Sequence, residues 1–479
     1  MFAVLVCLGL AGFLAPAAFA AHPPEVRAPL PWRVGGAFGF TVDAASFPDS
    51  AGYALEVYVR LAPAALLAVG GGGSEGGRFA LALTLRNSYG GLERHVEQDF
   101  VASGGDTAGG LGKVVVLPFR TSAGEHRLQV RMTAPARKGV SRRTQAVSVE
   151  GVVTVPASEK GVDLSDLGFV WSESGGEDPR AFRRGPRSLT PNPERLYGLF
   201  ADSVRATFVA RAPAGSERPW HWVARILDAG GGAVSALEGA GAAGRWLDAS
   251  LAMDLSQQPA GGYDLEVKAW QEGDAGALLR RGHFSIGWEV ETWTTSPQEI
   301  LDGAHLLLGP DSEEDYARMQ PGEQEKMMGD FWRERDPTPD TGQNEARETY
   351  LKRANFANRT FGRAGFGKGM FSDMGRVFIR YGEPSEVLKQ VIPARDNTLA
   401  EMIRQLAASD TREVGDLNDR RIGPDMRPFE VWIYEGDIPL PLDADPHAVH
   451  MPHTRGRRLV FLFVDEQWLG DYRLRYSTE

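Results

Sequence analysis

The stretch Tyr53-Ala-Leu-Glu-Val-Tyr-Val-Arg-Leu61 decides the fold class, because apolar residues occupy every second position along it. A period of two with one apolar face is typical of a half-buried β-strand. The same alternation returns at 79–85 and 126–132, and glycine-rich runs such as 70–77 separate these strands. Short alternating strands joined by turns predict an immunoglobulin-like β-sandwich over residues 25–156.

A second sandwich is predicted over residues 162–292, where alternating strands recur at 204–208, 220–226, 263–269 and 284–290. The stretch 117–130 resembles 253–267, and the resemblance aligns Ala123-Gly124 with Ala260-Gly261. This echo supports two sandwiches of similar build.

Three tryptophans of the second sandwich have two interpretations. Trp220, Trp222 and Trp270 either line a glycan-binding face or belong to the hydrophobic core. Large aromatic residues in a β-region usually pack in the core, so the core interpretation is favoured.

The pattern changes after Trp293, where helix formers dominate 297–308, 322–335 and 343–361. Strands are expected again at four places. The run 459–464 is apolar on both faces, which is typical of a central strand. The sequence therefore predicts an α+β domain over 295–479. The four expected strands are 377–381, 431–434, 459–464 and 472–476.

Three stretches of this domain, 331–345, 353–361 and 369–384, resemble in order and spacing the GWxTD domain of exported bacterial proteins. That family is named for a Gly-Trp-x-Thr-Asp motif before a Gly-Arg-Val strand. Here the motif is Gly369-Met-Phe-Ser-Asp373, so methionine replaces tryptophan and serine replaces threonine. The preceding β-rich regions resemble those that accompany this domain. The resemblance implies export, a bacterial origin and the fold, but no activity.

The first twenty residues are expected to be a signal peptide. They are apolar or small, and they end in Ala18-Phe-Ala20, the small-x-small pattern that precedes cleavage, so the mature chain would begin at Ala21. A membrane anchor is the alternative, which the glycines and Pro16 disfavour. We therefore expect a secreted, periplasmic or cell-envelope protein without a membrane span after cleavage.

Composition excludes several kinds of chemistry. Cys7 is the single cysteine, so signal removal would leave no disulfide, thiolate nucleophile or cysteine–metal site. The net charge of −11 and the lack of basic tracts disfavour nucleic acid as a partner. No cofactor is expected.

Three motifs have weak functional interpretations. The run 72–76 matches G-x-S-x-G, but it lies between strands, where a nucleophile elbow needs a following helix. The glycines of 365–369 could receive an anion, although a turn-forming loop is favoured. The third motif is a possible metal site, but neighbouring prolines forbid a regular helix, which favours a loop. Its residues are His447, His450 and His453.

A polar cluster accompanies the GWxTD-like signature. Its members are Asp336, Glu345, Arg353, Asn355, Asp373 and Arg376. In one interpretation, Asp336 and Asp373 form a carboxylate pair that lines a hydrolase site, held by Arg353. In the other, Arg353 clamps the loops around both aspartates, since buried charges must be paired. The structural interpretation is favoured.

These observations favour a non-catalytic binding or scaffold protein of the cell envelope, whose partner is a protein or another envelope component. An envelope hydrolase using Asp336 and Asp373 is the alternative, and metal binding by the loop 447–453 is the third. Carboxylates in one solvent-reaching cleft would favour the hydrolase, whereas carboxylates sealed against Arg353 would favour the scaffold.

Overall fold

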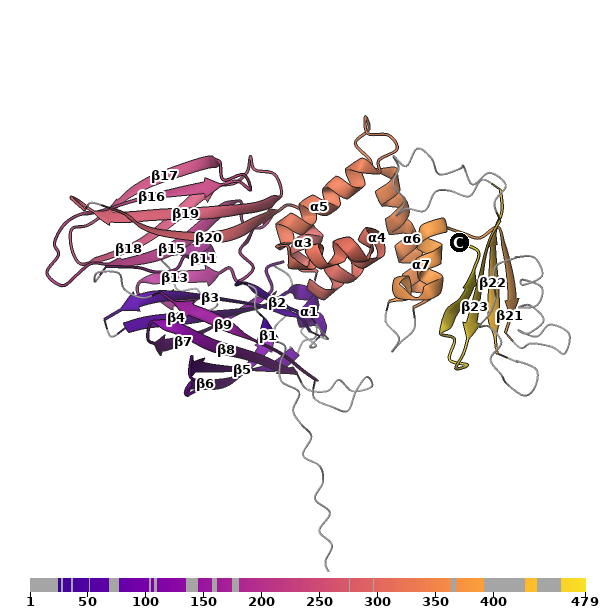
Figure 1. Ribbon diagram of the computed structural model, residues 1–479, viewed down its shortest axis with the longest axis horizontal. Coiled ribbons are helices and arrows are strands. Elements are labelled where there is room, and N and C mark those ends of the chain that lie inside the picture. Colours follow the sequence, from indigo (N-terminus) through magenta and orange to yellow (C-terminus); the bar gives the residue numbers. More distant parts are fainter. Residues whose placement is uncertain are drawn as a thin grey trace, which may run out of the picture.

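The structure is a computed structural model of the chain (Figure 1). The residues that it describes are 25–26, 29–35, 38–50, 52–68, 77–102, 105–106, 110–134, 145–156, 162–174, 181–274, 276–295, 297–362, 368–391, 427–436 and 458–479.

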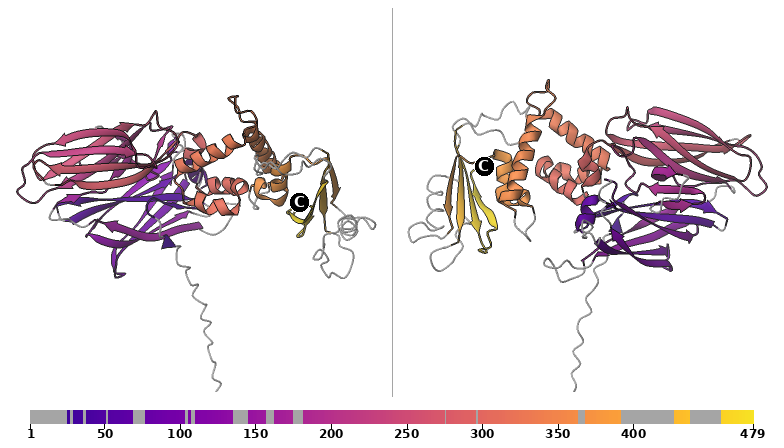
Figure 2. Two further views of the ribbon diagram at one scale, coloured as in Figure 1. Left: turned by 45° about the horizontal axis from the view of Figure 1, so that its top comes forward. Right: turned by 180° about the vertical axis from the view of Figure 1, so that it is seen from behind.

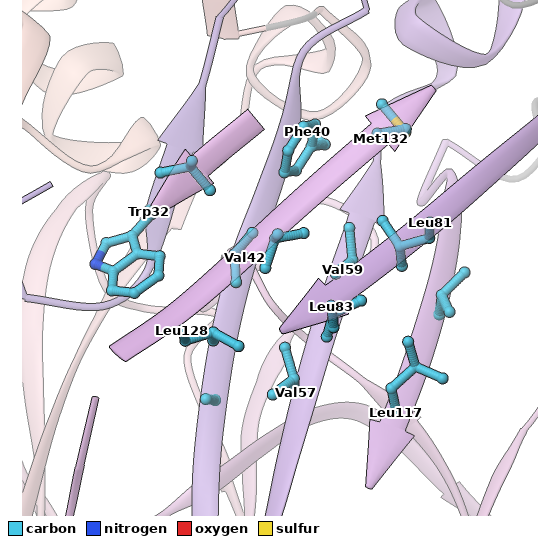
Figure 3. Close-up of a cluster of buried hydrophobic side chains, with 14 of the residues drawn as sticks. Trp32, Phe40, Val42, Val57, Val59, Leu81, Leu83, Leu117, Leu128 and Met132 are labelled. Atoms are coloured by element: carbon cyan, nitrogen blue, oxygen red, sulfur yellow. The ribbon is translucent and has the colours of Figure 1, made fainter. Parts of the chain in front are cut away.

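The first sandwich contains the predicted alternating strands. Its elements are β1 (Glu25–Val26), β2 (Trp32–Val34), β3 (Phe40–Asp49), β4 (Gly52–Leu61), α1 (Pro63–Ala68), β5 (Gly77–Asn87), β6 (Leu92–Ala102), β7 (Lys113–Thr121), β8 (Gly124–Ala134) and β9 (Gln145–Val155). One sheet has the order β1-β9-β8-β5-β6 and the other β2-β3-β4-β7. Figure 3 shows Val42, Val59, Leu83 and Leu128 in the core between them, and all four are fully buried. The alternation of apolar residues therefore builds this core.

The second sandwich repeats this architecture. Its strands are β10 (Asp163–Leu164), β11 (Gly168–Ser174), β12 (Phe182–Arg184), β13 (Arg187–Pro191), β14 (Leu196–Gly198), β15 (Ser203–Arg211), β16 (Trp220–Leu227), β17 (Ala233–Gly241), β18 (Trp246–Asp254), β19 (Gly261–Gln271) and β20 (Leu278–Gly287). One sheet has the order β10-β15-β11-β13-β12, with β18 beside β15, and the other has the order β14-β20-β19-β16-β17. Trp220 and Trp222 lie in the core between the sheets, which confirms the core interpretation for both.

The sequence echo has a structural counterpart. Gly124 begins β8 and Gly261 begins β19, and each strand is 11 residues long. Both glycines have positive φ, 128° and 153°, which other residues rarely adopt. The aligned Ala-Gly pairs therefore mark the same kind of turn into a central strand.

Buried ion pairs join the two sandwiches. Arg195 Nη2 lies 2.7 Å from Asp43 Oδ1, and Arg60 Nη1 lies 2.8 Å from Glu194 Oε1. Strand β3 is consequently buried on both faces along nearly its whole length. In Figure 1 the sandwiches lie against one another along this strand.

Helices follow the second sandwich. They are α3 (Val290–Thr294), α4 (Pro297–Arg318), which breaks at Gly309, α5 (Pro321–Glu334), α6 (Glu345–Thr360), the short 3₁₀ helix η1 (Gly369–Phe371) and α7 (Asp373–Tyr381). Gln320 and Glu323 form a capping box on α5, and the Asn344 side chain caps α6. Figures 1 and 2 show these helices between the sandwiches and the last sheet.

The expected strand at 377–381 is wrong, because these residues belong to α7. The Ser372 hydroxyl accepts a hydrogen bond from Gly375 N and begins the helix. Met374, Val377 and Tyr381 then recur at helical spacing and pack against the last sheet. A short run of β-branched and aromatic residues is compatible with both a strand and a helix. Here the Ser372 cap and the packing against the last sheet favour the helix.

The last sheet has the order β21-β22-β23-β24. Its strands are β21 (Glu386–Gln390), β22 (Phe429–Tyr434), β23 (Leu459–Asp465) and β24 (Tyr472–Ser477). Strand β23 is interior and buried throughout, as its apolar sequence predicts. The chain is therefore mainly β, with two immunoglobulin-like sandwiches followed by an α+β region, which confirms the predicted fold class.

Candidate functional site

The two candidate catalytic carboxylates line different hollows. Asp336 follows α5, and its Oδ1 accepts a hydrogen bond from Thr338 N at 3.0 Å. Asp373 begins α7, and its Oδ2 accepts one from Leu474 N on β24 at 2.8 Å. The hollow at Asp373 has a volume of about 290 Å³ and includes the exposed Arg376. Each aspartate is thus engaged locally, and the two line separate hollows in the described part of the chain.

Arg353 holds the end of a helix rather than the two aspartates. Its Nη1 donates to the carbonyl oxygens of Ile379 and Arg380, at 2.9 and 3.1 Å, at the C-terminal end of α7. Gly382, with φ of 81°, lies directly against the guanidinium group of Arg353 and leaves no room for a side chain there. Burial lowers the pKa of Arg353, although the charge is well placed beside the negative end of the helix dipole. Arg353 is therefore a helix-capping residue.

The remaining signature residues are dispersed. Glu345 begins α6, and its carboxylate accepts a hydrogen bond from the Thr338 hydroxyl at 2.7 Å, which lowers the pKa of Glu345. Asn355 is exposed on α6. The polar signature is consequently not a single constellation of side chains.

A groove of about 640 Å³ runs along α5 and is the candidate functional site. We call it the α5 groove. Its walls come from the β18–β19 connection, α3, α4 and the start of α6, and α5 extends along its length. The α5 residues that line it are Pro321, Gln324, Glu325, Lys326, Met328, Gly329, Asp330, Trp332 and Arg333.

Glu325 anchors one wall of the groove. Its Oε1 accepts hydrogen bonds from Trp288 N at 2.8 Å and Glu289 N at 3.1 Å, and its Oε2 accepts one from the Thr292 hydroxyl at 2.6 Å. A carboxylate at the start of α3 satisfies backbone amides that have no partner within the helix. Glu325 thus fixes α3 against α5.

Most other charges of the groove are paired at its surface. Asp330 Oδ2 accepts from Lys326 Nζ at 2.6 Å and Oδ1 from Arg333 Nη1 at 2.5 Å, and these hydrogen bonds lower the pKa of Asp330. Glu291 and Asp336 form no ion pair within the described part of the chain. Among the described residues, Glu291 and Asp336 are therefore without a cation, as is Glu325, whose hydrogen-bond donors are neutral.

Sequence reasoning missed both the α5 groove and a histidine bridge next to it. His283 Nδ1 lies 3.0 Å from Asp264 Oδ1, and Nε2 lies 3.1 Å from Glu323 Oε1. Asp264 and His283 are cross-strand neighbours in β19 and β20, whereas Glu323 belongs to the capping box of α5. The alternation of β19 placed Asp264 on the outer face, but no local signal links it to a helix some sixty residues away.

Several predictions lie outside the described residues. These are the signal peptide with Cys7, the run 72–76, most of the loop 365–369, and His447, His450 and His453. Among the residues that are described, no three His, Cys, Asp or Glu side chains gather as a metal site would require. Within the same ranges, no helix combines the length and hydrophobicity that crossing a bilayer requires. The core interpretation is wrong for Trp270, which is partly exposed and stacks on His221, with ring centroids 5.8 Å apart.

Comparison with family models and with curated proteins found no match. Among solved structures, the chain is similar to a transglutaminase of red sea bream (10% identity, TM-score 0.17), covering 52% of this chain and 31% of the transglutaminase. It is also similar to DUF3823 family proteins of Bacteroides ovatus (8% identity, 44% of this chain and 90% of that one) and Parabacteroides merdae (11%, 45% and 89%). Both have a TM-score of 0.17, so these likenesses carry no argument about function.

Proposed function

We propose that the protein is a non-catalytic binding or scaffold protein of the bacterial cell envelope, exported and related to the GWxTD proteins. The observation that carries this proposal is the separation of Asp336 and Asp373 into different hollows. A pair of carboxylates that shares acid–base work must reach one substrate. Each aspartate instead accepts a backbone amide of its own surroundings.

A rigid junction of three parts supports the scaffold role. Arg33 of β2 donates to Gln324 at 3.1 Å and Gln320 at 3.3 Å, which ties the first sandwich to α5. The buried Arg60 donates to Glu194 and to the carbonyl oxygen of Trp293, each at 2.8 Å. Buried charge networks of this kind hold a geometry well when every member is satisfied. The two sandwiches and α5 therefore form a platform that can present a binding surface.

Photo-cross-linking of the full protein in its native envelope tests the proposal. We expect a discrete partner to be captured, and we expect the Asp373→Asn protein, which lacks one of the two carboxylates that a hydrolase would need, to capture it equally well. An envelope-degrading activity that is present in the parent and lost in Asp373→Asn would overturn the proposal in favour of the hydrolase.

Export is tested separately by the intact mass of the protein from its host. Cleavage after Ala20 predicts a mature chain that begins at Ala21. A chain that retains Met1 and is attached to the membrane would contradict export followed by release, and it would favour the membrane-anchor alternative.

A further inference from the structure

One face of α5 changes its surroundings along the helix. Gly322 lies in the first turn, where an added Cβ would stand 2.2 Å from the carbonyl oxygen of Ile286 on β20. Seven residues later, Gly329 lies on the same face, and an added Cβ there would meet nothing within 4 Å. The helix therefore packs tightly on the second sandwich at its start and then leaves it, which opens the α5 groove.

Packing explains the first glycine but not the second. A glycine inside a helix costs about 0.5–1 kcal/mol relative to alanine. Gly322 offsets that cost through close contact with β20, whereas Gly329 faces open space in the groove lining. A local rule broken without a structural gain is expected where a surface serves a function.

The lining of the groove combines an apolar base with a surplus of negative charge. Ile300, Met328 and Trp332 supply apolar surface from α4 and α5. Carboxylates outnumber cations in the lining, as Glu289, Glu291, Glu325, Asp330 and Asp336 stand against Lys326, Arg333 and Arg347.

Most charged side chains of the groove lining already have a partner. Arg347 pairs with Glu289, with 3.3 Å between Nη2 and Oε2, and Lys326 and Arg333 share Asp330. Glu325 is occupied by the start of α3. Glu291 on α3 and Asp336 after the end of α5 therefore remain without an ion pair in the described part of the chain, and they are the carboxylates available to a ligand.

We propose that the α5 groove binds a basic peptide segment of a partner protein, with its apolar side chains on Ile300, Met328 and Trp332 and its lysine or arginine side chains beside Glu291 and Asp336. This inference rests on the proposed binding function and names the partner's chemistry. The groove volume falls in the range of sites that enclose a ligand of several hundred cubic ångströms. Charge complementarity of this kind selects the partner and speeds its association.

Fluorescence anisotropy with the full mature chain tests the inference. The probe is a labelled peptide of alternating leucine and lysine, and the comparison ligands are its leucine–glutamate counterpart and spermine. We expect the basic peptide to bind, the acidic peptide not to bind, and spermine to compete only weakly. Spermine that binds as tightly as the peptide would overturn the peptide assignment in favour of a small-cation site.

Two variants locate the binding. Glu291→Lys/Asp336→Lys should weaken binding at least tenfold, and Gly329→Gln should weaken it by filling the groove while leaving the melting temperature equal or higher. The matched control, Glu217→Lys/Asp340→Lys, makes the same charge change at exposed positions outside the lining. Equal losses of affinity in the control and groove variants would show that the peptide is attracted to the negative charge of the whole protein rather than to the groove, and would overturn the inference.

The same variants separate this inference from the proposed function. If cross-linking in the envelope captures a partner that the groove variants still bind, the groove assignment is wrong and the binding function stands. If neither a partner nor the peptide is bound, both the groove assignment and the proposed binding function are wrong.

Discussion

Charged residues gather at two places in this protein, the interface between the sandwiches and the α5 groove, with opposite consequences. At the interface, Glu194 is buried and meets both Thr41 and Arg60. In the groove, the charges are largely exposed, and Glu291 and Asp336 lack an ion pair within the described ranges. Burial makes pairing obligatory at the first place, whereas solvent tolerates unpaired charge at the second. The first set therefore determines stability, and the second contains the carboxylates of the proposed binding site.

The largest expected effect is at the interface. Glu194→Ala removes the partner of the buried Arg60 and should lower the free energy of unfolding by about 3–5 kcal/mol. Burial alone would raise the pKa of Glu194, but the charges of Arg60 and Arg33 outweigh it and the pKa is lowered. The carboxylate is thus ionised and needed in that form. Denaturant unfolding of the full mature chain measures the loss.

Glu314→Ala is the control for this prediction, since its pair with Arg318 is fully at the surface. It should change stability by less than about 0.5 kcal/mol. Equal effects of the two substitutions would show that burial does not separate the two kinds of charge.

A smaller effect is expected at Asp373, which is partly buried. Asp373→Ala should cost about 1–2 kcal/mol, because it removes the acceptor of Leu474 N and a negative charge from the first turn of α7. Asp373→Asn should recover part of this loss, since its amide oxygen still accepts the hydrogen bond. Thermal melts of the two variants test this prediction. If both variants melt like the parent, Asp373 does not contribute to stability.

Gly329→Ala should stabilise the protein by about 0.5–1 kcal/mol, because alanine favours the helix and the added methyl group meets nothing. Gly322→Ala is the matched control on the same helix face, and it should destabilise because it collides with β20. Melting temperatures measure both. A destabilising effect of Gly329→Ala would show that the added methyl group collides with neighbouring atoms, so that the space beside Gly329 is not open.

The smallest effect concerns pH and the bridge between the sandwich and α5. Burial opposes the charge on His283, but hydrogen bonds to Glu323 and Asp264 outweigh it and raise its pKa above 6.5. Its stabilisation is therefore complete below pH 6.5 and is lost as pH rises through the folded-state pKa. Because the side chain is 40% exposed, solvent screening limits the effect to about 0.5 kcal/mol.

Unfolding of the parent and of His283→Gln at pH 6 and pH 8.5 measures this contribution. The parent should be more stable relative to the variant at pH 6. A difference that does not change with pH would show that the pKa of His283 is the same in the folded and the unfolded chain.

The sequence predicted most of the fold because its signals were local. Alternation identified the sandwich strands, and the doubly apolar run 459–464 identified the interior strand β23. The error at 377–381 arose where the local signal was ambiguous, and contact with the last sheet made the segment α7. The candidate site could not be predicted in this way. The signature residues belong to one stretch of the sequence, but in the structure their two aspartates line separate hollows.

The sequence by itself determined the mainly β architecture, the two sandwiches and the helices that follow them, since apolar periodicity and caps act over a few residues. Only the tertiary structure decided which charges are buried, where Arg353 donates and where α5 leaves the sandwich to open a groove. These features depend on contacts between residues far apart in the chain, such as Arg33 with Gln324. No local pattern encodes them, because burial and pairing exist only once the parts have packed together.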